Sequence, residues 1–279
     1  MKESKGLEWW VVMLALIWLC GIGCFGFWEE ERFALLQLKA SINYPNETSL
    51  PSWEDRVEGY NSMESDCCYW EGVECNETTS HVIKLFLNST RNWSLGDWYF
   101  NASLFLPFKE LRNLDLSNNQ LVGWVANEAG FERLSVLSKL EVLRLDYNYF
   151  NNSILSSLGL LSSLQRLYIS VNYLNGSIHL QDFPATSNLE ELDLSYNGNI
   201  TSLTTMIGMK SLNKLQVLRM KGITFNASVL HSLGALPSLR KLILRVEGLV
   251  TKKVDEKDLP VNKSRMICNY RYRLVEKFS

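Results

Sequence analysis

This sequence of 279 residues has only three histidines and lacks the short motifs that mark common catalytic sites. There is no Gly-X-Ser-X-Gly turn and no glycine-rich phosphate loop, and His81, His179 and His231 lie far apart along the chain. Its cysteines, histidines and acidic residues do not follow the spacing of a metal site. We therefore expect a protein that is not an enzyme and that binds no metal or cofactor.

Net charge is also scarce, with 28 Lys and Arg residues against 30 Asp and Glu residues. Nucleic-acid-binding domains usually carry a clear basic excess, so nucleic acid is not an expected partner. Hydrophobic residues make up 46% of the chain, which excludes an intrinsically disordered protein.

The N-terminal segment has the pattern of a secretory signal. Lys2 and Lys5 precede an uncharged run of 20 residues from Trp9 to Trp28, and small residues follow its apolar core. An uncleaved membrane anchor is the alternative, because a run of this length just suffices to span a bilayer. Both interpretations place the rest of the chain in the secretory pathway.

A leucine-rich phrase, L-x-x-L-x-L-x-x-N-x-L, recurs at intervals of 24 to 29 residues, a period typical of leucine-rich repeats. The leucines of L-x-L point to one side of a short strand, and repeats must stack to bury them, which builds a parallel sheet. The Asn turns inward, where its amide can pair with buried backbone groups. Leucine-rich amphipathic helices are disfavoured, because the phrase does not keep a period of 3.6. Copies begin at Leu111, Leu140, Leu164, Leu189, Leu215 and Leu239, with a degenerate first copy at Val82.

Ahead of the repeats, the spacing predicts a helix from Glu30 to Ile42 and then a cysteine-closed hairpin. We expect one broad apolar face on the helix, made of Phe33, Leu35, Leu36, Leu38, Ala40 and Ile42.

The fold class is therefore α/β, a right-handed leucine-rich-repeat solenoid with a parallel β-sheet on its concave face and a helix-plus-hairpin N-terminal cap. In the last two copies Ile223 and Glu247 replace the Asn, and the basic segment after them offers the last coil no polar cap. We divide the chain into a signal peptide or anchor (1–26), the cap (27–80), the repeats (81–249) and a non-repeat tail (250–279).

Ten Asn-X-Ser/Thr sequons agree with export, because such acceptors are glycosylated in secreted proteins. Asn151, Asn175 and Asn226 share the twelfth position of their repeats, which predicts sugars along one flank, and a glycan on Asn88 would lie at the edge of the concave face. The full set is Asn46, Asn76, Asn88, Asn92, Asn101, Asn151, Asn175, Asn199, Asn226 and Asn262.

The run Glu29–Lys39, then Trp53, then Cys-Cys-X-Trp-X-Gly-Val-X-Cys at Cys67–Cys75, resembles the N-terminal cap of plant leucine-rich-repeat receptor-like proteins. The repeats extend the resemblance to about residue 249. It implies an extracellular recognition module at the outer face of the plasma membrane or in the apoplast, acting in immune or developmental signalling.

Within that resemblance, Cys68 can pair with Cys75, a bond worth roughly 2–3 kcal/mol. Family members usually have another cysteine before the Glu-rich start, where this chain has Phe27, so Cys67 has no obvious partner.

The chain ends without the membrane span or kinase domain of such receptors, so we expect a receptor-like protein truncated within its repeat array. The alternatives are a secreted inhibitor of cell-wall-degrading enzymes, similar in plan to polygalacturonase-inhibiting proteins, and a fragment with no function of its own.

Alternation along each strand identifies the side chains expected on the concave face. The last two rows are basic, which favours an acidic peptide or pectic sugar at that end, although solvated strand residues explain the same pattern. The expected partners are an extracellular peptide, a protein or a cell-wall carbohydrate, with a co-receptor kinase as a further possibility. The candidate ligand-binding residues are Asp115, Arg144, Asp146, Arg166, Tyr168, Asp193, Arg219, Lys221, Lys241 and Arg245.

Overall fold

The computed structural model describes residues 29–43, 49–54, 66–124, 130–183, 187–204, 212–223, 236–245, 265–270 and 273–274. The predicted signal (1–26), the sequons at Asn46, Asn226 and Asn262, and Glu247 lie outside the described residues. A search of the described residues finds no helix with the length and apolarity needed to cross a membrane.

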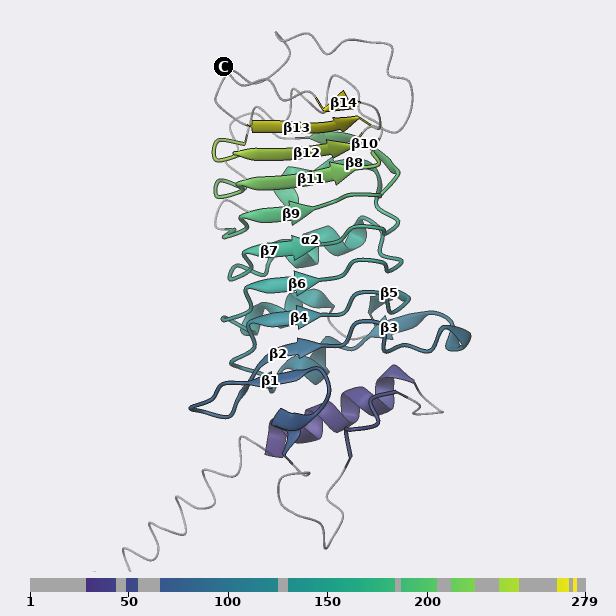
Figure 1. The fold of residues 1–279 in the computed structure, drawn as a ribbon, viewed down its shortest axis with the longest axis vertical. Helices are drawn as coiled ribbons and strands as arrows, with labels where there is room; N and C mark the ends of the chain where they lie inside the picture. The colour runs from purple at the N-terminus through teal and green to yellow at the C-terminus, as the bar shows by residue number, and fades with distance from the viewer. Residues whose placement is uncertain are drawn as a thin grey trace, which may run out of the picture.

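Short strands from successive coils lie side by side in one sheet of ten strands, which runs the length of the molecule (Figure 1). Neighbours from β2 to β13 are parallel, whereas β1 and β14 pair antiparallel at the two edges. The predicted leucine-rich-repeat solenoid is confirmed. In sheet order the strands are β1 (Val73–Cys75), β2 (Val82–Phe86), β4 (Asn113–Asp115), β6 (Val142–Arg144), β7 (Arg166–Tyr168), β9 (Glu191–Asp193), β11 (Val217–Lys221), β12 (Lys241–Arg245), β13 (Arg265–Tyr270) and β14 (Arg273–Leu274).

The leucine at the fourth position of each repeat holds the strands in register, because each one pairs with its equivalent in the next coil. Full burial of a leucine side chain contributes about 1.5–3 kcal/mol, so the row forms a continuous apolar spine behind the sheet. The row consists of Leu85, Leu114, Leu143, Leu167, Leu192, Leu218 and Leu242, all buried.

Buried asparagines connect the coils where the chain leaves each strand. Asn148 Nδ2 donates to the carbonyl oxygens of Leu116 (3.0 Å) and Leu145 (3.1 Å), and Asn148 Oδ1 accepts from the backbone N–H groups of Asn119 (3.1 Å) and Leu121 (2.9 Å). Each amide thus satisfies backbone groups of its own coil and of the preceding one. The ladder consists of Asn119, Asn148, Asn172 and Asn197.

Beyond the ladder the coils form a second, irregular layer. Two pairs of parallel strands stand beside the main sheet, β3 (Trp98–Phe100) with β5 (Leu121–Trp124) and β8 (Asn175–His179) with β10 (Asn199–Thr204). Short helices cover the back of the sheet, with α2 behind β7 (Figure 1). They are η3 (Ala102–Phe105), η4 (Phe131–Val136), α2 (Ser153–Gly159) and η5 (Leu180–Asp182). A further short helix, η2 (Trp93–Leu95), precedes β3 and buries none of its residues.

The N-terminal cap covers the first coil with a helix over residues 29–42. Its core-facing residues include Leu35, Leu38 and Ile42, spaced to lie on one helical face. The prediction for Phe33 is wrong, because this side chain lies about 200° of helical turn from Leu35 and is 61% exposed.

A cysteine hairpin completes the cap. After η1 (Cys67–Tyr69), Cys68 forms a disulfide with Cys75 at the end of β1. Behind this hairpin, the Trp53 ring stacks on Trp70 at 5.7 Å between centroids, and Trp53 Nε1 donates to the carbonyl of Glu71 at 2.8 Å.

The sheet extends into the predicted non-repeat tail. In β13, Met266 pairs with Leu242, which precedes it by 24 residues, the same separation as between Leu218 and Leu242. The backbone therefore adds a strand past residue 249, where the sequence no longer shows the leucine phrase.

Candidate ligand-binding surface

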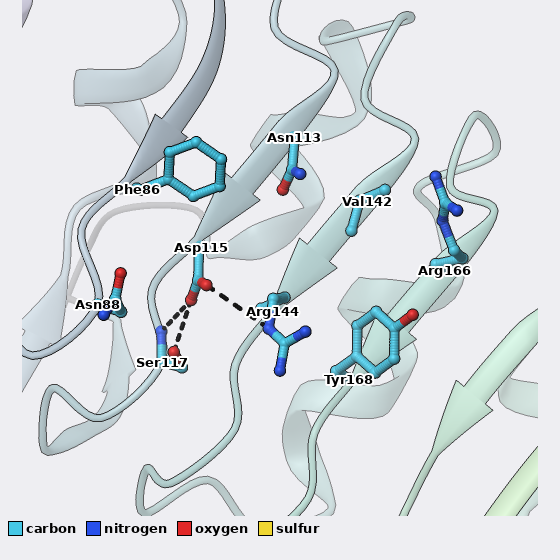
Figure 2. A pocket seen from close by; sticks show the side chains of 9 residues that line it. All are labelled: Phe86, Asn88, Asn113, Asp115, Ser117, Val142, Arg144, Arg166 and Tyr168. Carbon is cyan, nitrogen blue, oxygen red and sulfur yellow. Dashed lines mark hydrogen bonds and ion pairs between the residues drawn. The ribbon is translucent and has the colours of Figure 1, made fainter. Parts of the chain in front are cut away.

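The concave face is hollowed between β2 and β7 into an open depression of about 460 Å³ (Figure 2). Its lining comes from alternate strand positions, whose sequence neighbours point into the leucine core. Four predicted ligand-binding residues lie here: Asp115, Arg144, Arg166 and Tyr168. Phe86, Asn88, Asn113, Ser117 and Val142 complete the lining.

Arg144 stands at the centre of the depression and is held from three sides. Its guanidinium carbon lies 4.6 Å from the centroid of the Tyr168 ring, a cation–π contact. Its Nε lies 3.5 Å from Asp115 Oδ2, and its Nη2 lies 3.0 Å from Asp146 Oδ2. The cation is therefore fixed in place before any ligand arrives.

Asp115 is held in turn by Ser117. The backbone N–H and the hydroxyl of Ser117 both donate to Asp115 Oδ1, at 2.9 and 2.6 Å. Figure 2 shows the carboxylate between these donors and Arg144. Because these rotamers are already ordered, a ligand that contacts them loses less side-chain entropy on binding.

Asp146 supports this arrangement from below instead of facing a ligand. It is only 4% exposed, and its Oδ1 accepts from the backbone N–H (3.0 Å) and the hydroxyl (2.7 Å) of Ser170. Burial raises the pKa of Asp146, and the Ser170 hydrogen bonds and the Arg144 charge only partly oppose it. Asp146 lies two residues past Arg144, the last residue of β6, where alternation along the strand no longer determines the side-chain direction.

A second cluster of charges follows on β9 and β11. Arg219 Nε donates to Glu191 Oε1 at 2.9 Å and lies 3.8 Å from Asp193 Oδ2. Burial works to lower the pKa of Arg219, but the two carboxylates outweigh it and the pKa is raised. Arg219 is therefore a paired cation, which weakens the predicted basic end of the face.

The other basic candidates differ in what surrounds them. Within the part of the chain that the structure describes, neither Lys221 nor Lys241 makes an ion pair, and Lys241 is exposed. The side chain of Arg245 lies outside the described residues.

Tyr168 lies between the two clusters. Burial, followed by the negative charge of Glu191, raises the pKa of Tyr168, so its phenol stays protonated as a hydrogen-bond donor. Glu191 was not among the candidates. Its position at the first outward site of β9 was visible in the sequence, but its pairing with Arg219, 28 residues later, was not.

Two polar contacts inside the cap were not predicted. His81 Nδ1 lies 3.2 Å from Glu31 Oε1, and the backbone N–H of Val82 donates to Glu31 Oε2 at 3.0 Å, which ties the first helix to β2. Burial raises the pKa of the Glu31 carboxyl.

Cys67 is buried, and among the described residues it forms no disulfide. Burial raises the pKa of its thiol to about 12, so it is held as an unreactive thiol.

Two family models match the chain. One, described as a leucine rich repeat N-terminal domain, covers residues 29–76, and the other, a leucine rich repeat, covers residues 110–130.

Curated relatives extend the match over most of the chain. "Cuscuta receptor 1" of Solanum lycopersicum is 35% identical over 243 residues, which are 83% of this chain and 19% of that protein. "Receptor-like protein 9a" of Arabidopsis thaliana is 38% identical over 188 residues, 67% of this chain and 19% of that protein. The chain thus spans about a fifth of the length of these relatives.

Among solved structures, "Pollen Receptor Kinase 3" superposes with a TM-score of 0.51 at 20% identity, covering 79% of this chain and 99% of that one. At this identity the match supports the fold alone.

Proposed function

We propose that this chain, a leucine-rich-repeat protein related to plant receptor-like proteins, is an extracellular recognition module that binds a peptide or protein on its concave face. The observation that carries the proposal is the depression around Arg144, where three strands supply fixed polar groups to one open surface. The described residues there offer binding chemistry, and neither His81 nor His179 is among the lining residues.

The chemistry of the depression favours a ligand of mixed polarity. Asp115 and Arg144 neutralise each other in part, whereas Arg166 is exposed and Tyr168 offers an aromatic face with a phenolic donor. Peptides present backbone carbonyls, carboxylates and apolar side chains together, and these match such a surface. A neutral or acidic oligosaccharide of the cell wall is the competing ligand.

A binding screen tests this proposal. The full chain, secreted from plant cells and immobilised, is exposed to a random peptide display library and to an array of cell-wall oligosaccharides. We expect peptide ligands whose affinity falls about tenfold or more in Tyr168→Ala and in Arg166→Ala, as for residues central to an interface. The matched control is Leu160→Ser, an exposed residue after α2 on the opposite side of the sheet.

Unchanged affinity in both concave-face variants would place the ligand elsewhere. Selective binding of oligosaccharides, with loss in the same variants, would keep the surface and change the ligand class.

We also propose export through the secretory pathway, with residues 1–26 as the signal and the sequons as glycosylation sites. The position at the plasma membrane or in the apoplast, a role in defence or development, and cooperation with a co-receptor kinase belong to the same proposal. Two features support it: ten sequons and a cysteine hairpin closed by a disulfide. Mass spectrometry of the secreted protein tests export directly, since a cleaved signal leaves a new N-terminus near residue 27.

A further inference from the structure

Aromatic residues precede half of the sequons at a fixed distance. An aromatic residue lies two positions before the asparagine in five of the ten sequons, whereas aromatics make up 11% of the chain, so about one such case is expected. The five pairs are Tyr44 with Asn46, Phe86 with Asn88, Tyr99 with Asn101, Tyr149 with Asn151, and Tyr173 with Asn175.

The spacing has a geometric consequence. In an extended chain, residues two apart point to the same side. At Asn175 the structure adds direction: the side-chain nitrogen Nδ2 lies 3.4 Å from the carbonyl oxygen of Tyr173 and donates to it. The atom that would carry a sugar is therefore turned back toward the tyrosine.

Among the described residues, the Tyr173 ring is stacked on one face only. That face stacks on Tyr149, with 5.3 Å between centroids and 8° between planes. The tyrosines occupy the tenth position of their repeats, and the next coil has Gly198 there, where an added Cβ would meet no atom within 4 Å. No side chain of that coil covers the ring at this position, and Tyr173 is 63% exposed.

We propose that the first N-acetylglucosamine of a glycan on Asn175 packs its apolar face on the other face of Tyr173, with Tyr149 supporting the ring from behind. The C–H groups of a sugar face carry a partial positive charge and the aromatic face a negative one, so the two surfaces complement each other. The glycan would then be a fixed part of the flank, clear of the concave face.

The modification is an ordinary group transfer from a lipid-diphosphate-linked oligosaccharide. The bond between the first sugar's C1 and the phosphate oxygen breaks, a bond forms from C1 to Asn175 Nδ2, the amide loses one proton and the lipid diphosphate leaves. This inference rests on the proposed export, which brings the chain to that donor.

Asn76 provides the matched comparison, because its sequon has Glu74 two residues earlier. Asn76 Oδ1 accepts from the backbone N–H groups of Thr78 (2.9 Å) and Thr79 (3.0 Å), so its turn is as well defined as that of Asn151, whose Oδ1 accepts from Ser153 N–H at 3.0 Å. Asn76 and Asn151 therefore share this turn and differ in the aromatic residue, whereas Asn175 itself begins β8.

The test is thermal unfolding of the full secreted chain after an endoglycosidase has trimmed every glycan to one N-acetylglucosamine. Asn175→Gln, which removes one sugar, is compared with the parent in three backgrounds: Tyr173, Tyr173→Phe and Tyr173→Leu. We expect the sugar to raise Tm by about 2–4 °C with Tyr173 or with Phe at that position, and by less than about 1 °C with Leu. Asn76→Gln, with and without Glu74→Ala, should show no such dependence.

An equal Tm difference in all three backgrounds would overturn the proposal, and so would an unoccupied Asn175 in glycopeptide maps of wild-type protein whose other sequons carry sugars. Since Tyr173 lies outside the depression, either result leaves the concave-face proposal standing. A secreted chain with no occupied sequon would contradict glycosylation as a whole.

Discussion

The leucines are in register at both ends of the sheet, but the two ends differ in how buried backbone groups are hydrogen-bonded and in how charged side chains are paired. From β4 to β9 each coil closes on a buried asparagine, whereas the coil after β11 has Ile223 at that position, also buried. The strands β11 and β12 still pair in full register. Strands therefore stack without an asparagine at this position, and the asparagines add satisfied backbone groups at the N-terminal end.

Charge differs along the same axis. In the N-terminal half, Arg144 is surrounded by Asp115, Asp146 and an aromatic ring. Arg219, further along the sheet on β11, also has carboxylate partners. Past it, Lys241 stands exposed on β12. The paired cations thus extend one coil beyond the asparagine ladder, and Asp115, Arg144 and Tyr168 of the candidate ligand site lie on coils that carry the ladder.

Removal of a ladder asparagine should lower the unfolding free energy more than any other change considered below. Asn148→Ala leaves the buried N–H groups of Asn119 and Leu121 without their acceptor, whereas the carbonyls of Leu116 and Leu145 keep Asn119 and Asn172 as donors. We expect a loss of about 2–4 kcal/mol in unfolding free energy by denaturant titration. At the other end, Ile223→Val should cost only about 1 kcal/mol. Equal losses would show that the ladder does not distinguish the two ends.

Loss of the disulfide in the N-terminal cap should have the second largest effect on unfolding free energy. The double variant Cys68→Ser/Cys75→Ser removes a bond across a separation of seven residues, and we expect a loss of about 2–3 kcal/mol. Cys67→Ala, which removes a buried thiol without breaking a bond, is the control and should cost less. Wild-type-like unfolding of the double variant would mean that the Trp53–Trp70 packing holds the cap unaided.

Substitution of a paired cation should destabilise the fold more than substitution of an exposed cation, but by a smaller amount than the changes above. Arg219→Ala breaks contacts with Glu191 and Asp193, which are partly screened by solvent, so we expect a loss of about 1 kcal/mol that shrinks at high salt. Lys241→Ala should stay within about 0.5 kcal/mol of wild type. The comparison fails if the lysine variant proves the more destabilised of the two.

The smallest expected effect is a pH dependence from Asp146. Its folded pKa is raised above the unfolded value, so the native state binds the proton more tightly, and this group stabilises the fold as pH falls through the folded pKa toward the unfolded one. Asp146→Asn removes this gain, so the variant should lose more stability than wild type as pH falls through that window. A smaller acid loss in the variant than in wild type would mean that hydrogen bonds, not burial, dominate this carboxyl.

Much of this fold was predictable, because the leucine phrase repeats at nearly constant spacing. The row at the fourth repeat position and the buried asparagines followed from the sequence, as did four residues of the depression. Phe33 was not placed correctly, since a broad apolar stripe does not say which part of it meets the core. The strand at Arg265–Tyr270 was missed because backbone pairing does not require the leucine pattern.

The sequence by itself determined the class of the molecule, since a repeat that cannot bury its own leucines has to stack on its neighbours. Tertiary structure alone decided which charged side chains are paired within the protein and which are available to a ligand. Glu191 and Arg219 are 28 residues apart in the chain yet adjacent across neighbouring strands, so a cation that looks free in the sequence is neutralised in the fold. It also decided that Asp146 lies under Arg144, and that Gly198 leaves one face of Tyr173 uncovered by its coil. Contacts of this kind depend on where coils lie side by side, and the spacing of one repeat does not contain that information.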